Sequence, residues 1–275
     1  MPLFWLRVAL TFYGVGLLYA VVTLWGSHRV LTRILLPAVG MGTVFHLVAI
    51  VEYVMRPDLA PPFLHQVESL MAFLLMAFFF VVYLRYQTAS PGVAVFPLVF
   101  LLTLSASAAS SALASSGGPT PTVSNSWIFM HVSLILVGYT ALFFTFFASI
   151  LYLIQERNLK AKGTGRRGIW SMLPALATID EIGYRCLVFG FPFMTLGLIA
   201  GSVVAEGRYG AKYFADPKIL ISIFMWVVYT ILLYTRWNAG WRGRRAAYMS
   251  AAAFAAAVVA LAANSLSQTH RFFTQ

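Results

Sequence analysis

Long apolar segments alternate with short polar connections along the whole chain. Each apolar segment spans about 20 residues or more, and at ~1.5 Å per helical residue this length crosses a hydrocarbon core of ~30 Å. Continuous segments of this length are typical of transmembrane helices and differ from the short alternating strands of a β-barrel. The pattern predicts eight transmembrane helices, over residues 3–25, 31–55, 63–86, 93–113, 127–155, 186–205, 219–237 and 247–266.

The composition supports a membrane-embedded fold. Apolar residues make up 60% of the 275 residues and charged residues 10%, with a mean hydropathy of +0.82. A soluble domain carries about 25% charged residues, so this composition excludes a soluble fold. We therefore predict an all-α, polytopic membrane helical bundle that forms a single transmembrane domain over residues 1–275.

Lysine and arginine collect in alternate connections. The connections after the first, third, fifth and seventh helices are the richer in these residues, and the positive-inside rule assigns them to the cytoplasm. Both termini and the polar loop 201–219 are then predicted to lie outside. The formal charge of +11 would suit nucleic acid. Because the basic residues lie in these short connections, we expect contact with the lipid bilayer and no nucleic acid.

The cysteine content limits the chemistry that this chain can perform. Cys186 is the single cysteine, which excludes an internal disulfide and a Cys-x-x-Cys pair. Any thiol chemistry must then come from a partner.

Residues 169–183 combine apolar spacing with an acidic end, and this pattern predicts a short helix lying in the membrane interface.

The histidines are the strongest candidates for chemistry. The predicted topology places His65, His131 and His270 on the outer side, and His28 on the inner side. Neutral imidazole is the usual haem ligand, so two imidazoles from different helices could hold the iron while aromatic rings cover the porphyrin. The alternative for each is a polar residue tolerated near lipid headgroups. His46 lies within the second helix, either as an interior haem ligand or as a helix-packing hydrogen bond.

The loop 201–219 is the main polar segment predicted on the outer side. It contains charges of both signs, three glycines, Tyr209 and Tyr213. A structural interpretation is a solvated turn in which Asp216 caps the seventh helix and Pro217 is its first residue. The segment Gly240–Ala246 is interpreted as a basic inner loop that sets topology.

Several of these segments carry a family resemblance. Residues 173–205, with Tyr209, Asp216, Lys218 and Trp226 beyond them, resemble the signature region of the cytochrome c assembly family of membrane proteins. That family includes the CcsA-type haem-handling subunits and the HemX-like proteins. Residues 127–157 and Gly240–Ala246 share the resemblance, which covers most of the chain from the third helix onward.

The resemblance implies a haem-handling protein of c-type cytochrome biogenesis. In that family a tryptophan-rich outer loop ending in Trp-Asp-Pro-Lys lies between two outer histidines, and together they present haem for attachment to apocytochrome c. The matching axial ligands are His131 and His270, and His46 matches a membrane-embedded histidine. The haem would be b-type and non-covalent. The partners implied are apocytochrome c and an assembly subunit with a large extracytoplasmic domain, in the bacterial inner (plasma) membrane.

The loop departs from the family pattern. Tyr209, Tyr213 and Ala215 stand where the family has tryptophans, and Ile219 replaces an acidic residue, although Asp216 remains. Less aromatic area is then available to stack on haem. Two hypotheses that involve haem follow. The protein is either a component of a haem-attachment (synthase) complex, or a HemX-like protein that senses or regulates haem biosynthesis without attachment. A third reading is a solute permease without haem.

Overall fold

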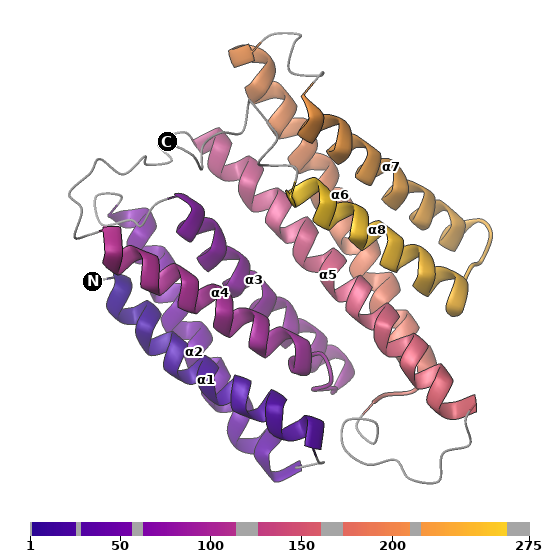
Figure 1. The fold of residues 1–275 in the computed structure, drawn as a ribbon, viewed down its shortest axis with the longest axis horizontal. Coiled ribbons are helices and arrows are strands. Elements are labelled where there is room, and N and C mark those ends of the chain that lie inside the picture. Colours follow the sequence, from indigo (N-terminus) through magenta and orange to yellow (C-terminus); the bar gives the residue numbers. More distant parts are fainter. Residues whose placement is uncertain are drawn as a thin grey trace. The chain divides into compact units, whose positions relative to one another are not determined.

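The chain folds into α-helices throughout the part that the structure describes. The computed structural model describes residues 2–25, 29–56, 63–113, 126–160, 173–209 and 216–262. Within these ranges there are eight helices and no strand, which confirms the predicted all-α fold class (Figure 1). The helices are α1 (Pro2–Trp25), α2 (Arg29–Met55), α3 (Phe63–Tyr86), α4 (Gly92–Leu113), α5 (Ser126–Lys160), α6 (Leu176–Tyr209), α7 (Pro217–Trp237) and α8 (Arg244–Ala262).

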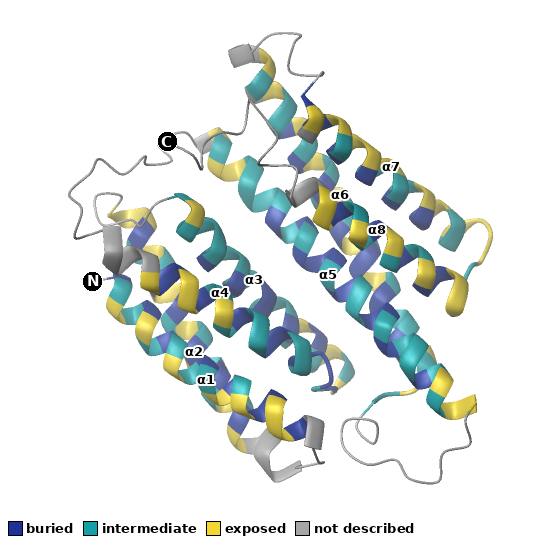
Figure 2. Ribbon diagram, viewed as in Figure 1, coloured by how far each residue is buried: buried dark blue, intermediate teal, exposed yellow. Residues whose placement is uncertain are grey.

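Six of these helices are long and apolar enough to cross a membrane. They are α1, α2, α3, α5, α6 and α7, while α4 gives a shorter apolar stretch over Gly92–Ala108. Exposed residues occur along the helices (Figure 2). They include large apolar ones such as Leu18, Leu84 and Phe224. Because such surfaces are stable only against hydrocarbon, the protein is a polytopic membrane protein.

Helix α6 is longer than the sequence pattern predicted. It begins at Leu176 and therefore includes residues 176–183, the second half of the segment predicted as a separate interfacial helix. It also continues to Tyr209, so residues 201–209 are helical rather than the first part of a loop. The charged residues of its first turns are tolerated because Arg185 pairs with Glu181 within α6 and Asp180 pairs with Arg236 of α7.

The helices group into two compact units. Unit 1 comprises residues 1–124 and 163–174 and contains α1 to α4, while unit 2 comprises residues 125–162 and 175–275 and contains α5 to α8. In unit 1, α1 packs against α2 and α4, and α3 packs against α4. Aromatic rings fill its core, where the centroids of Phe79 and Phe96 lie 4.8 Å apart.

Unit 2 is built on an antiparallel pair of helices, α5 and α6. Glycines at a seven-residue spacing, Gly183, Gly190 and Gly197, let the two backbones approach closely. A Cβ atom at Gly190 would lie 2.5 Å from the Cβ of Ala141. Small residues at such a contact are typical of membrane helix pairs.

Helix α8 lies antiparallel to α5 and packs against it. Arg244 at its start pairs with Glu156, and ten residues further on the ring of Phe254 stacks on Phe146, ten residues back along α5. These two contacts fix the register of α8 against α5.

Candidate functional site

His131 lies at the contact between α5 and α6 in unit 2. Its Nδ1 is 2.6 Å from the carbonyl oxygen of Gly197. A Cβ atom at Gly201 would lie 2.5 Å from Cε1 of the imidazole, so only glycine leaves room for the ring at this position. The imidazole therefore occupies a notch over Gly201 and is half-buried there.

The hydrogen bond to Gly197 determines which nitrogen of His131 can bind a metal. A carbonyl oxygen only accepts, so Nδ1 carries the proton and Nε2 of the neutral ring carries the lone pair. Histidines that ligate metals usually donate their other N–H to a carbonyl or carboxylate in this way, which fixes the tautomer and the ring orientation. The geometry of His131 thus fits an axial haem ligand.

The sequence alone did not predict the hydrogen bond between His131 and Gly197. The signal that could have found it is the glycine spacing along α6, in which Gly197 and Gly201 extend the series that begins at Gly183. Such spacing marks the face of α6 that meets α5. The residue opposite Gly201 then follows from the antiparallel register.

His46 lies in unit 1 and is fully buried, with 0% of its surface exposed. Its Nδ1 is 3.2 Å from the hydroxyl of Tyr13 on α1, and its Nε2 is 2.9 Å from Oγ of Ser69 on α3. These contacts join three helices, as the helix-packing interpretation expects. Coordination of iron by His46 would require one of the two hydrogen bonds to break.

His65 is engaged within its own helix. Its Nδ1 is 2.9 Å from Oε2 of Glu68, three residues further along α3. Tyr209 is the last residue of α6, and its side chain is not among those described. Tyr213, His28 and His270 lie outside the described residues.

Asp216 and Pro217 begin α7 in the manner of a helix start. The Asp216 carbonyl accepts hydrogen bonds from the amides of Ile219 and Leu220, at 3.0 and 3.1 Å. Pro217 is the first helical residue, which confirms the structural interpretation of these two residues. Of the predicted loop 201–219, residues 201–209 belong to α6 and 217–219 to α7, while residues 210–215 lie outside the described part of the chain.

A groove of about 360 Å³ lies between α6 and α7. At ~100° per residue, Gly197 and Gly201 face away from the α6 residues that line this groove. The groove is therefore separate from the notch of His131. Its lining consists of Thr195, Leu198, Ile199, Ser202, Val203, Glu206 and Trp226.

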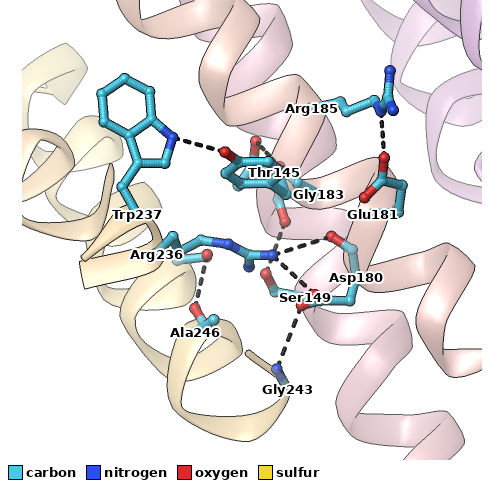
Figure 3. A network of polar contacts seen from close by, with 12 residues as sticks. Thr145, Ser149, Asp180, Glu181, Gly183, Arg185, Arg236, Trp237, Gly243 and Ala246 are labelled. Atoms are coloured by element: carbon cyan, nitrogen blue, oxygen red, sulfur yellow. Dashed lines mark hydrogen bonds and ion pairs between the residues drawn. The ribbon is translucent and has the colours of Figure 1, made fainter. Parts of the chain in front are cut away.

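A polar network lies at the end of unit 2 that is remote from His131 (Figure 3). Asp180 of α6 accepts hydrogen bonds from Arg236 at 3.0 Å and from the backbone amide of Gly243 at 3.4 Å. Trp237 donates to the hydroxyl of Tyr184 at 2.7 Å. The segment Gly240–Ala246, interpreted from sequence as a basic loop, is therefore attached to α6 by a carboxylate.

The fold and the His131 geometry define a class: a multi-pass helical membrane protein with a tautomer-fixed imidazole at a helix contact. The family described as "Cytochrome C assembly protein" matches residues 6–270 of this chain. The chain belongs to the cytochrome c assembly protein family. It is thus a membrane protein of cytochrome c biogenesis.

The individual relatives are cytochrome c biogenesis proteins. The cytochrome c biogenesis protein CcsA of Guillardia theta is 30% identical over 203 residues, which cover 68% of this chain and 67% of the relative. The CcsA proteins of Chlamydomonas reinhardtii and Prochlorococcus marinus (strain MIT 9303) are each 32% identical. Their matches cover 49% and 50% of this chain but only 36% and 51% of the relatives. No solved structure matches the chain.

Proposed function

We propose that this protein binds one haem non-covalently at its outer face, with His131 and His270 as axial ligands, and presents it for attachment to apocytochrome c. The observation that carries the proposal is the hydrogen bond from Nδ1 of His131 to Gly197, which leaves the lone pair on Nε2. Haem supplies the vinyl groups that become bonded to the acceptor's thiols. The contribution of this chain is to hold and orient it.

The register of α8 supports the pairing of the two histidines. Sixteen residues separate Phe254 from His270, and sixteen separate Phe146 from Met130, the neighbour of His131. Beyond Ala262, the eight residues to His270 span ~12 Å if helical and ~26 Å if extended. The remaining distance along α5 to the level of His131 is about 10–11 Å, at ~1.5 Å per residue. The chain is therefore long enough to bring His270 beside His131.

The loop between α6 and α7 completes the proposed site. Tyr209 ends α6 about 12 Å along the axis beyond Gly201, at ~1.5 Å per residue. We place Tyr209 and Tyr213 over the haem face and Asp216 at the start of α7, where it anchors the loop. His46 is assigned to packing in this proposal, because both of its ring nitrogens already have partners.

The attachment reaction requires proteins other than this chain. Cys186 is buried within α6, so the acceptor and a partner must supply the reactive thiols. We infer an assembly subunit with a large extracytoplasmic domain as that partner, and the bacterial inner membrane as the location. A HemX-like role, in which haem is sensed without attachment, is favoured by Tyr209 and Tyr213 standing in place of tryptophans.

A reconstitution experiment tests these readings. The protein is produced with the partner subunit and an apocytochrome that contains a Cys-x-x-Cys-His motif, in a host lacking its own assembly proteins. The proposal predicts covalent haem on the acceptor. Bound haem with no covalent product, accompanied by altered tetrapyrrole synthesis, would support the HemX-like role instead. A purified protein that takes up no haem would leave the permease reading.

Substitution of Gly201 tests the notch directly. Gly201→Ala is expected to displace the His131 ring and to weaken haem binding by about 10- to 100-fold, the usual effect of disturbing a ligand's supporting contacts. Gly190→Ala is the matched control, since its Cβ meets Ala141 at the same 2.5 Å without touching a histidine. It should cost about 1–3 kcal/mol of stability through overpacking. Titration with haemin measures the haem affinity of both variants. Equal affinity in the two would contradict the claim that the notch over Gly201 positions the His131 ring.

A further inference from the structure

The end of unit 2 that contains the polar network carries an excess of positive charge. Among the residues that the structure describes, seven basic side chains lie there beside three acidic ones, namely Arg157, Lys160, Arg185, Arg236, Arg242, Arg244 and Arg245 against Glu156, Asp180 and Glu181. Glu156 is shared between Lys160, at 2.7 Å, and Arg244, at 3.5 Å. Asp180 is used by Arg236 and Glu181 by Arg185. In the described part of the chain, Arg157, Arg242 and Arg245 form no ion pair, and all three are exposed.

The turn that carries Arg242 is held in a defined conformation. Gly240 and Gly243 have φ values of +60° and +67°, which side chains with a Cβ rarely adopt. A Cβ atom at Gly243 would lie 2.7 Å from the hydroxyl of Tyr152 on α5, so the turn packs closely on that helix. The bond from the Gly243 amide to Asp180 fixes its other side. The exposed guanidinium groups therefore extend from an ordered base.

Amphipathic aromatic side chains surround these charges. Trp237 at the end of α7 is 62% exposed and Tyr248 on α8 is 49% exposed. The guanidinium of Arg245 lies 5.9 Å from the ring of Trp241, and that of Arg244 lies 5.9 Å from the ring of Tyr248. Exposed tryptophan and tyrosine beside arginine are typical of the level of lipid headgroups. A surface that binds a soluble anion has no need of exposed aromatic rings.

We propose that this basic surface, formed by Arg157, Arg242, Arg244 and Arg245, is a binding site for the headgroup of an anionic phospholipid. Guanidinium groups pair with phosphate oxygens through two parallel N–H bonds. The exposed rings and the apolar faces of α7 and α8 meet the glycerol and acyl parts of the same lipid. The site is independent of haem, because its residues lie at the end of α5 remote from His131.

A lipid titration of the purified full-length protein tests the proposal. Thermal unfolding is followed in detergent while dioleoylphosphatidylglycerol, dioleoylphosphatidylcholine or inorganic phosphate is added. We expect phosphatidylglycerol to raise the midpoint temperature at concentrations at least tenfold below those needed with phosphatidylcholine. Stabilisation by inorganic phosphate at the same concentration would show a soluble-anion site and overturn the lipid assignment.

Charge variants locate the site. Arg242→Gln with Arg245→Gln should raise the half-saturating concentration of phosphatidylglycerol by about 25-fold, since each basic residue near an anionic lipid contributes roughly fivefold. The control, Arg56→Gln with Arg85→Gln, removes two exposed charges from unit 1 and should leave the half-saturating concentration within about twofold. Arg242→Lys with Arg245→Lys keeps the charge and should retain most of the affinity. Equal losses in the two glutamine variants would overturn the proposed location.

Discussion

Replacing His131 with alanine is expected to remove haem from the purified protein, and replacing His270 should have the same effect. The physical reason is that each residue supplies one axial bond to a single iron, so either loss leaves the haem held by one ligand and the loop. The haem-to-protein ratio, determined as the pyridine haemochrome, measures the effect. We expect a fall of at least tenfold in each variant.

Two other histidines provide matched controls for this prediction. His28 is predicted to lie on the inner side, and His65 is predicted to lie on the outer side but is engaged by Glu68 within α3. Substitution of either by alanine should leave the haem content unchanged. Loss of haem from His65→Ala would show that the outer histidines act as a group. Equal haem in all four variants would refute the ligand assignment.

Asp180→Ala is expected to lower the free energy of unfolding by about 2–3 kcal/mol. The ion pair with Arg236 is largely buried, with 18% of the Asp180 side chain and 8% of the Arg236 side chain exposed. Removal of one partner from a buried pair costs about 3–5 kcal/mol, because the other charge is left without compensation. Because both side chains keep some contact with water, we expect the cost for this pair to fall below that range. Unfolding in mixed micelles measures the difference.

The adjacent ion pair is the control for Asp180. Glu181 and Arg185 are 43% and 60% exposed, so Glu181→Ala should cost less than about 1 kcal/mol. In the double variant Asp180→Ala with Arg236→Ala no buried charge is left alone, and its cost should be smaller than the sum of the two single variants. Additive costs would mean that the two side chains do not act as a pair.

The helices were predictable because hydrocarbon imposes one rule on the whole chain. Every spanning segment must be apolar over its length, and the eight predicted segments correspond to the eight helices described. The start of α6 was not predictable in this way. Asp180 and Glu181 looked like the polar end of a separate helix, and only their pairing with Arg236 and Arg185 shows how α6 accommodates them.

The candidate site was less predictable than the fold. The sequence supplied His131 as a candidate, but its bond to Gly197 joins residues that are 66 positions apart. For His46, a ligand and a packing residue were equally consistent with the sequence. The partners Tyr13 and Ser69 come from two other helices, so the choice between these roles depends on helix packing that no local pattern encodes.

The absorption spectrum of the purified wild-type protein tests the central claim most directly. If His131 and His270 ligate the same iron, the reduced protein should show the sharp bands of a low-spin, six-coordinate bis-histidine haem, at about one haem per chain. A five-coordinate high-spin spectrum would contradict the paired ligation. A preparation that binds no haem, even after addition of haemin, would contradict haem binding itself.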